Sequence, residues 1–248
     1  ENHDSDPDFL SGLIKPGDTI VLVTPIDTGA PKGRLILPQV QAVRSVLDAD
    51  AQCVVVRENR LSQILETLKT PPAFVITDSQ VVRHVVDVVP ENIPVTTFSI
   101  EMSVMKSDLT SLVRGAAALN TLRPGDRVMI CETCSHHPQP DDIGRKKIPR
   151  WLAQKIGGEL RIDVVVGKDF PPDLSPYKVI IQCGGCVVTR RHMLARLREA
   201  TKQNVPMTNY GIAISFLQGV LARALSLHPE ALKAYRNETA RLSVQNKS

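Results

Sequence analysis

Short runs of β-branched and aliphatic residues alternate with amphipathic segments along most of the chain. Such runs are typical of buried strands, and the segments between them carry apolar residues at helical spacing. Strand–helix alternation of this kind predicts an α/β fold with parallel sheets and helices on both faces. The expected strands are residues 19–24, 53–56, 73–77, 94–99, 127–131, 161–166, 178–182 and 205–209. The expected helices are residues 34–49, 61–69, 81–89, 107–122, 148–157, 189–203 and 211–227.

The strand pattern restarts half-way along the chain. The turn Lys15-Pro16-Gly17-Asp18 recurs as Arg123-Pro124-Gly125-Asp126, and each turn leads into an apolar run. We therefore expect two parallel-sheet domains, residues 1–105 and 106–248. The polar tail beyond Pro229 is expected to be a solvated or partly frayed helix.

Composition narrows the class of protein. Of the 248 residues 42% are hydrophobic and 23% charged, as in ordinary globular chains. The net charge of +4 is mild and lacks the clustered basic footprint of a nucleic-acid binder. No apolar run approaches the roughly 20 residues that span a bilayer, so no membrane segment is expected. Because the sequence does not begin with Met, we expect it to be part of a longer protein.

Four of the five cysteines form two Cys-x-x-Cys pairs, Cys131 with Cys134 and Cys183 with Cys186. An odd cysteine count without a signal peptide argues against a disulfide framework and favours metal or redox chemistry in a reducing compartment. Both pairs follow predicted parallel strands, whose carboxyl ends are where open α/β sheets bind ligands. Gly184 and Gly185 would let both sulfurs of the second pair face one metal.

The first pair is less symmetrical. Cys131 continues an apolar strand, where a buried thiol packs well, whereas Cys134 lies in the following loop. We interpret Cys134 as a ligand and Cys131 as a core residue, although a site using all four thiolates remains open. His136 could be a ligand, a hydrogen-bond donor to a sulfur, or a loop residue. Zinc and iron–sulfur clusters both accept three or four thiolates, so spacing does not separate them.

Motifs for other chemistry are missing from the sequence. It contains no Gly-x-x-x-x-Gly-Lys-[Ser/Thr] phosphate loop and no glycine-rich dinucleotide fingerprint. A Ser-His-Asp or paired-carboxylate site would need partners that the sequence does not place. We therefore expect no catalytic residues in this chain.

Four long strings resemble HydF, the FeFe-hydrogenase maturation GTPase family: PIDTGAPKGRLILPQVQAVR, CSHHPQPDDIGRKKIPRWL, QCGGC and TNYGIAISFLQGVLARAL. The resemblance covers the chain up to about Leu227. Members of that family have an N-terminal GTPase domain, a dimerisation domain and an iron–sulfur domain. The resemblance implies that residues 1–105 form the dimerisation domain and residues 106–248 the cluster domain. GTP hydrolysis is then not expected of this chain.

The family's cluster motif, Cys-x-His followed later by His-Cys-x-x-Cys, maps onto Cys134, His136, Cys183 and Cys186, with Gln182 in place of the second histidine. It implies a 4Fe-4S cluster on three cysteines, with one iron open to an exchangeable fourth ligand. His136 is the candidate for that ligand.

The implied function is that of a homodimeric scaffold and carrier in H-cluster assembly. Its cargo would be the di-iron subcluster precursor, which radical-SAM maturases build and apo-hydrogenase receives. The implied location is the cytoplasm, or a reducing organelle in a eukaryote. Two alternatives rest on the cysteines alone: a structural zinc-binding interaction protein and a Cys-x-x-Cys dithiol oxidoreductase.

Overall fold

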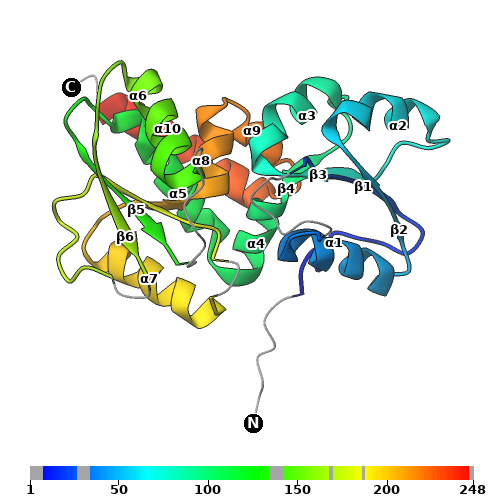
Figure 1. Cartoon of the computed structure of the whole chain (residues 1–248), viewed down its shortest axis with the longest axis horizontal. Coiled ribbons are helices and arrows are strands. Elements are labelled where there is room, and N and C mark those ends of the chain that lie inside the picture. The colour runs from blue at the N-terminus through cyan, green and yellow to red at the C-terminus, as the bar shows by residue number, and fades with distance from the viewer. Residues whose placement is uncertain (1–7, 27–33, 134–141, 168–169, 186–187, 246–248) are drawn as a thin grey trace, which may run out of the picture.

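The protein contains two four-stranded parallel sheets lying side by side, each wrapped by helices (Figure 1). The structure is a computed structural model that describes residues 8–26, 34–133, 142–167, 170–185 and 188–245. The strand orders are β2-β1-β3-β4 and β6-β5-β7-β8, so the predicted α/β fold is confirmed. The strands are β1 (Thr19–Val23), β2 (Gln52–Val56), β3 (Phe74–Thr77), β4 (Val95–Thr97), β5 (Arg127–Glu132), β6 (Arg161–Val166), β7 (Val179–Gln182) and β8 (Met207–Asn209).

The helices largely follow the predicted segments. None in the described ranges is long and apolar enough to cross a bilayer. The helices are α1 (Leu37–Asp48), α2 (Leu61–Thr67), α3 (Val82–Val88), α4 (Phe98–Lys106), α5 (Leu109–Ala118), α6 (Ile148–Ile156), α7 (Arg190–Lys202), α8 (Tyr210–Leu217), α9 (Leu221–Ala224) and α10 (Pro229–Gln245). A π-helical turn (Ile143–Lys147) precedes α6, and short 3₁₀ turns occupy Glu58–Arg60, Ser79–Val81 and Leu119–Thr121.

Two predicted elements differ from the structure for identifiable reasons. The segment 94–99 was expected to be wholly strand, but Thr97 caps α4 by accepting a hydrogen bond from the Ile100 N–H. The predicted helix 211–227 breaks after α8, where Gly219 takes a φ of 74°. That left-handed conformation suits glycine and ends the helix, so α9 starts in a new direction.

The chain returns to the first sheet after completing the second. Ser226 Oγ accepts a hydrogen bond from Val95 N at 2.9 Å and donates one to Val95 O at 3.1 Å, at the free edge of β4. Arg223 donates to the carbonyls of Pro90 and Ile93. The predicted division between residues 105 and 106 falls inside α4 and stays a prediction.

The polar tail is a docked helix rather than a wholly solvated one. Helix α10 packs against α5 and buries Ala231 and Ala234. Just before α10, His228 Nε2 lies 2.8 Å from Glu101 Oε1, and Thr96 donates its hydroxyl to the same oxygen. Glu101 is only 2% exposed, so this cluster fixes the start of α10 to α4 in the interior.

Helix α5 lies so close to β8 that only glycine fits at one position. A Cβ atom on Gly115 would stand 1.9 Å from the carbonyl oxygen of Met207. A backbone carbonyl cannot move aside as a flexible side chain can, so Gly115→Ala should push α5 away from the sheet. We expect the free energy of unfolding, measured in urea, to fall by about 1–3 kcal/mol.

The matched control for Gly115→Ala is Arg114→Ala, at the neighbouring exposed position of the same helix. We expect the control to change the free energy of unfolding by less than about 0.5 kcal/mol. Equal stability of the two variants would contradict the close packing of α5 on β8.

Candidate metal centre

The two described cysteines of the second sheet lie at its carboxyl edge. Cys131 pairs with Gln182 across β5 and β7, and Gln182 pairs with Asn209 across β7 and β8. The next residues along β7 and β8, Cys183 and Tyr210, therefore continue side by side beyond the sheet. The Cys183 N–H extends the ladder by donating to the Cys131 carbonyl at 2.8 Å.

The Cys183 sulfur is surrounded by hydrogen-bonding groups. Thr133 N lies 3.2 Å from Sγ and donates to it, and Thr133 Oγ1 lies 2.8 Å from the same atom. The Gln182 side-chain amide approaches Sγ at 3.4 Å. Cys183 is 6% exposed, so these contacts act in a largely dry environment. Donors aimed at a sulfur favour its thiolate form, which is the form that binds metals.

A buried arginine orients the Gln182 amide. Arg196 donates from Nη1 to Gln182 Oε1 at 2.6 Å and from Nη2 to the Gly167 carbonyl at 2.7 Å. A guanidinium can only donate, so the amide oxygen has to face Arg196. The amide N–H groups then face the Cys131 carbonyl and the Cys183 sulfur. Gln182 thus serves as a hydrogen-bond donor to sulfur at the position where the family motif has histidine.

Cys131 has the surroundings of a core residue. It is 1% exposed, and burial raises the pKa of its thiol to about 12, while the Arg196 charge acts in the lowering direction and the Cys183 charge in the raising one. A free thiol buried among apolar side chains packs as a small hydrophobic residue. These properties favour the interpretation of Cys131 as structural.

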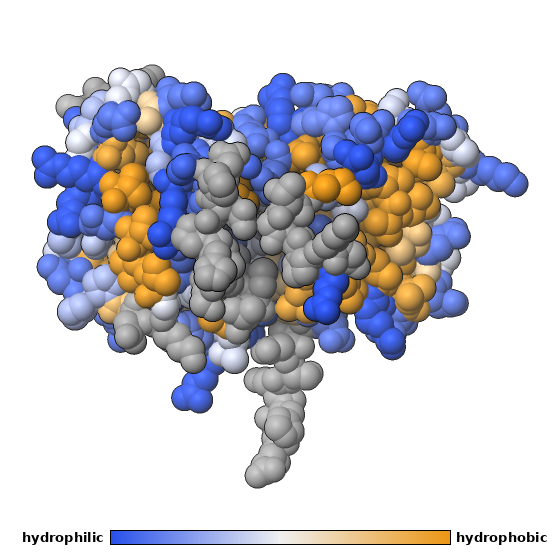
Figure 2. All heavy atoms as spheres, viewed as in Figure 1, coloured by the Kyte–Doolittle hydropathy of each residue, from blue (hydrophilic) through white to orange (hydrophobic). Residues whose placement is uncertain are grey.

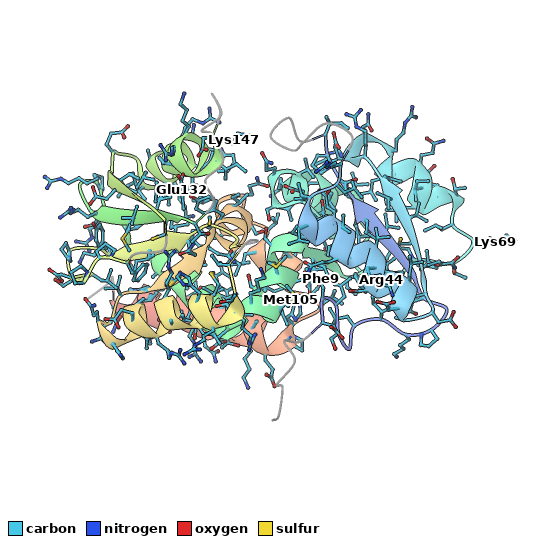
Figure 3. All side chains as sticks on the ribbon, turned by 60° about the horizontal axis from the view of Figure 1, so that its bottom comes forward. Phe9, Arg44, Lys69, Met105, Glu132 and Lys147 are labelled. Atoms are coloured by element: carbon cyan, nitrogen blue, oxygen red, sulfur yellow. The ribbon has the colours of Figure 1, made fainter. Side chains whose placement is uncertain are left out.

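An ion pair ties the end of β5 to the π-helical turn. Arg145 donates from Nη2 to Glu132 Oε2 at 2.8 Å and from Nε to the same carboxylate, and Glu132 is 8% exposed. The Asp142 carboxylate accepts from the Arg145 N–H at 2.8 Å and so caps the turn. Figure 3 shows Glu132 and Lys147 on the same side of the second sheet. Lys147 reaches across to the Gln80 side chain at 3.0 Å, which links this edge to the first sheet.

The last helix of the first sheet holds the loop after Cys183. Lys106 on α4 donates to the carbonyls of Gly185 and Val188, at 3.2 and 2.9 Å. Gly185 has a φ of 64°, a left-handed conformation that suits glycine. Arg190, at the start of α7, donates to the Met105 carbonyl of α4 at 2.7 Å. In Figure 3, Met105 lies where the two halves of the protein meet.

Tyr210 presents a buried hydroxyl at the same edge. Its Oη has no hydrogen-bond partner among the residues that the structure describes. A Cβ atom on Gly144 would lie 2.1 Å from Oη, so the hydroxyl occupies the space that a side chain at 144 would take. Burial, and then negative charge at Cys183 and Glu132, raise the pKa of the phenol well above its usual value.

Three of the four predicted ligands, Cys134, His136 and Cys186, lie outside the described residues, and only Cys183 can be placed. Within the described ranges no three His, Cys, Asp or Glu side chains converge as a metal site would require. Cys53 lies on β2 and packs against the hydrophobic core of the first sheet, away from the cysteine edge.

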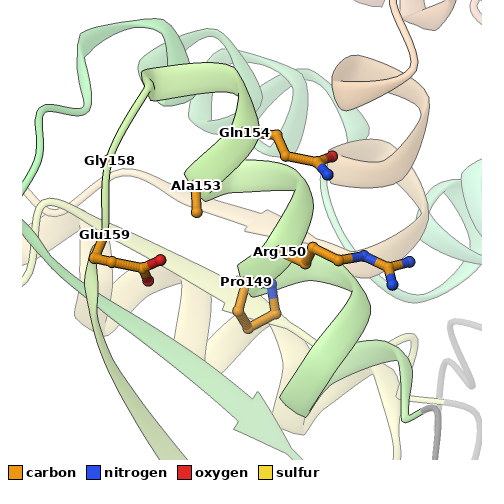
Figure 4. A pocket seen from close by; sticks show the side chains of 6 residues that line it. All are labelled: Pro149, Arg150, Ala153, Gln154, Gly158 and Glu159. Atoms are coloured by element: carbon orange, nitrogen blue, oxygen red, sulfur yellow. The ribbon is translucent and has the colours of Figure 1, made fainter.

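A shallow hollow of about 500 Å³ lies against α6. Figure 4 shows Arg150 and Glu159 among its lining side chains, and no cysteine contributes to it. It is therefore unsuited to hold a thiolate-bound metal.

Residues 9–107 match the family model for the hydrogen maturase F dimerization domain, and residues 110–227 match that for the tetramerization domain. The chain belongs to the HydF family. The second match ends at residue 227, which is where the sequence resemblance also ends. The cysteine edge of this HydF chain lies within its tetramerization match, and no curated protein matches the sequence.

Solved structures resemble this HydF chain only distantly. A putative LacI-family transcription repressor from Corynebacterium glutamicum is 12% identical, covering 86% of this chain and 92% of its own, with a TM-score of 0.28. Shikimate dehydrogenases from Mycobacterium fortuitum and Mycobacterium tuberculosis are 11% and 10% identical, each with a TM-score of 0.32. They cover 90% and 91% of this chain and 98% and 99% of their own. Scores this low carry no argument about function.

Sequence reasoning missed several residues of this edge. Thr133 and Arg196 contact the cysteine or the amide beside it. Thr133 directly follows a strand that ends at the candidate site, and this position is the one sequence feature that could have identified it. Arg196 gives none, since it looks like one of several arginines on an amphipathic helix.

Proposed function

We propose that this chain is an oligomeric scaffold of FeFe-hydrogenase maturation that binds a 4Fe-4S cluster through Cys134, Cys183 and Cys186. Its cargo is the di-iron subcluster precursor, received from radical-SAM maturases and delivered to apo-hydrogenase in a reducing compartment such as the cytoplasm. The observation that carries the proposal is the Cys183 sulfur at the carboxyl edge of β7, facing the donors on Thr133 and Gln182. Family membership supplies the cargo and the partners.

The described residues fit a cluster better than a closed zinc site. Iron–sulfur clusters are held by thiolates and tuned by hydrogen bonds to sulfur, which is the environment around Cys183. With Cys131 in the core, three thiolates remain, and a structural zinc site normally has four protein ligands. When bound, a cluster on three cysteines supplies one iron with an exchangeable position, for which His136 is the proposed protein ligand. The chain's own residues hold the sulfur, orient the amide and exclude water.

Anaerobic reconstitution with iron and sulfide tests this proposal. We expect about four irons per chain and an EPR signal of a reduced 4Fe-4S cluster, both lost in Cys134→Ser. A His136→Ala variant should keep its iron and change the EPR spectrum. Stoichiometric zinc without iron would instead favour the structural zinc protein. A reversible two-electron dithiol couple without metal would favour the oxidoreductase.

We propose that the exposed apolar face of α1 is the surface through which two copies dimerise. Leu37, Val40 and Leu47 share one helix face, opposite the buried Ala42 and Val46, and are 47%, 48% and 61% exposed. Figure 2 shows hydrophobic side chains gathered over this part of the first sheet. Contiguous exposed apolar patches mark interaction sites. Because residues 9–107 match the dimerization domain, we expect the partner that covers this face to be a second copy of the chain.

A negative charge introduced on the exposed face of α1 should dissociate the two copies of the chain. We expect Leu47→Glu to halve the mass of the assembly in sedimentation equilibrium, because an unpaired carboxylate would be buried in the interface. The control is Val244→Glu, an equally exposed apolar position on α10. An unchanged mass in Leu47→Glu would show that α1 lies outside the interface.

A further inference from the structure

We propose that the Tyr210 hydroxyl is a hydrogen-bond donor to an anionic sulfur of the group that Cys183 helps to hold. The inference rests on the proposed function and adds a positioning residue that the cysteine motif does not contain. A phenol O–H can donate one hydrogen bond, and a bound iron–sulfur cluster would supply sulfide and thiolate acceptors beside it.

The first support is the unmet hydrogen-bonding capacity of the phenol. Buried tyrosine hydroxyls usually find a partner, and one left without any destabilises the folded state. Tyr210 Oη is shielded from solvent, yet nothing in the described residues accepts its proton. A buried polar group of this kind needs a partner other than the described side chains, and a bound group with acceptor atoms would supply one.

The second support is where the hydroxyl lies. Tyr210 directly follows Asn209 of β8, and Cys183 directly follows Gln182, the residue paired with Asn209. Adjacent strands are about 4.8 Å apart, so the two residues start from neighbouring points on the same edge. The phenol lies against Gly144, in the turn that Arg145 ties to Glu132 at the end of β5, so its ring is directed toward the cysteine edge.

The third support is the glycine opposite. Gly144 is absent from the positive-φ positions, so its backbone conformation does not require glycine. What requires it is the phenol, whose Oη and Cζ would lie 2.1 and 2.7 Å from a Cβ atom. Gly144 belongs to a π-helical turn, a distortion often found at functional sites. Gly144 thus leaves room for the hydroxyl, and no side chain in the described ranges gives it a partner.

The test compares the whole chain with its Tyr210→Phe variant, which loses only the hydroxyl, and uses Tyr235→Phe on α10 as the matched control. In the anaerobically reconstituted protein, we expect Tyr210→Phe to keep its iron content but to have a more negative midpoint potential, because hydrogen bonds to sulfur stabilise the reduced cluster. The expected shift corresponds to about a tenfold change in the oxidised-to-reduced ratio, about 59 mV for one electron. The control should match the wild type.

The metal-free protein gives an independent readout. Removing an unsatisfied hydroxyl should raise the melting temperature of apo Tyr210→Phe by about 2–4 °C. A lower melting temperature would mean that the phenol has a structural partner, and an unchanged potential would mean that it does not reach the cluster; either result overturns the inference. If the wild-type protein binds no iron, that result contradicts the proposed function itself, not only the inference about Tyr210.

Discussion

Replacing Cys183 with serine is expected to abolish iron–sulfur binding by the whole chain while leaving the fold intact. The serine oxygen can still accept from the Thr133 N–H, so the edge of the sheet keeps its hydrogen bonds. A hydroxyl is nevertheless a hard, protonated ligand and does not replace a thiolate on iron. We expect reconstituted iron to fall from about four per chain to near zero. The free energy of unfolding of the apoprotein should change by no more than about 1 kcal/mol.

Two other cysteines are the controls for Cys183→Ser. Cys131→Ala should keep its cluster, because that thiol lies in the core of β5. Cys53→Ser, in the first sheet, should also keep it. Loss of iron in Cys131→Ala would show that all four paired cysteines are ligands and that the asymmetric interpretation is wrong. Full iron content in Cys183→Ser would contradict the proposed site altogether.

Arg196→Met is expected to cause the largest loss of stability among the variants considered. The guanidinium is 4% exposed and donates to Gln182 Oε1 and to the Gly167 carbonyl. Methionine fills much of the same volume but donates nothing, so two acceptors lose their partner in the interior. Each such loss costs about 1–3 kcal/mol, and we expect the free energy of unfolding in urea to fall by about 2–4 kcal/mol.

The same substitution should also disturb the cysteine edge. Without Arg196, only the 3.4 Å hydrogen bond to the Cys131 carbonyl favours the orientation in which the Gln182 amide nitrogen faces the Cys183 sulfur. We therefore expect a reconstituted Arg196→Met protein to show a broadened EPR spectrum. Arg198→Met, at an exposed position on the same helix, is the control and should change neither property. Wild-type stability in Arg196→Met would mean that the buried hydrogen bonds contribute little.

The strands were predictable because their signal is local. Runs such as residues 127–131 and 161–166 are rich in β-branched and aliphatic side chains, and the first of them is buried on both faces. The position of Cys183 also follows from a general rule, since residues after parallel strands meet at one edge. Whether Cys183 binds metal is still a prediction.

The remaining features depend on contacts between distant segments. Nothing local in residues 221–228 indicates that Ser226 and His228 bind to the first sheet. The docking of α10 was missed for the same reason, because its few buried alanines look like surface positions in a polar helix. Likewise, the role of Gly144 becomes visible only when Tyr210 lies against it.

The return of Ser226 to β4 has a consequence for synthesis on the ribosome. The group that completes this strand edge follows Val95 by 131 residues. An emerging chain can form β1 to β4 early, but the edge of β4 stays open until the second sheet has been made. Open strand edges invite pairing with other chains. We therefore expect the nascent first sheet to depend on chaperones, and slow translation of the second half to favour aggregation.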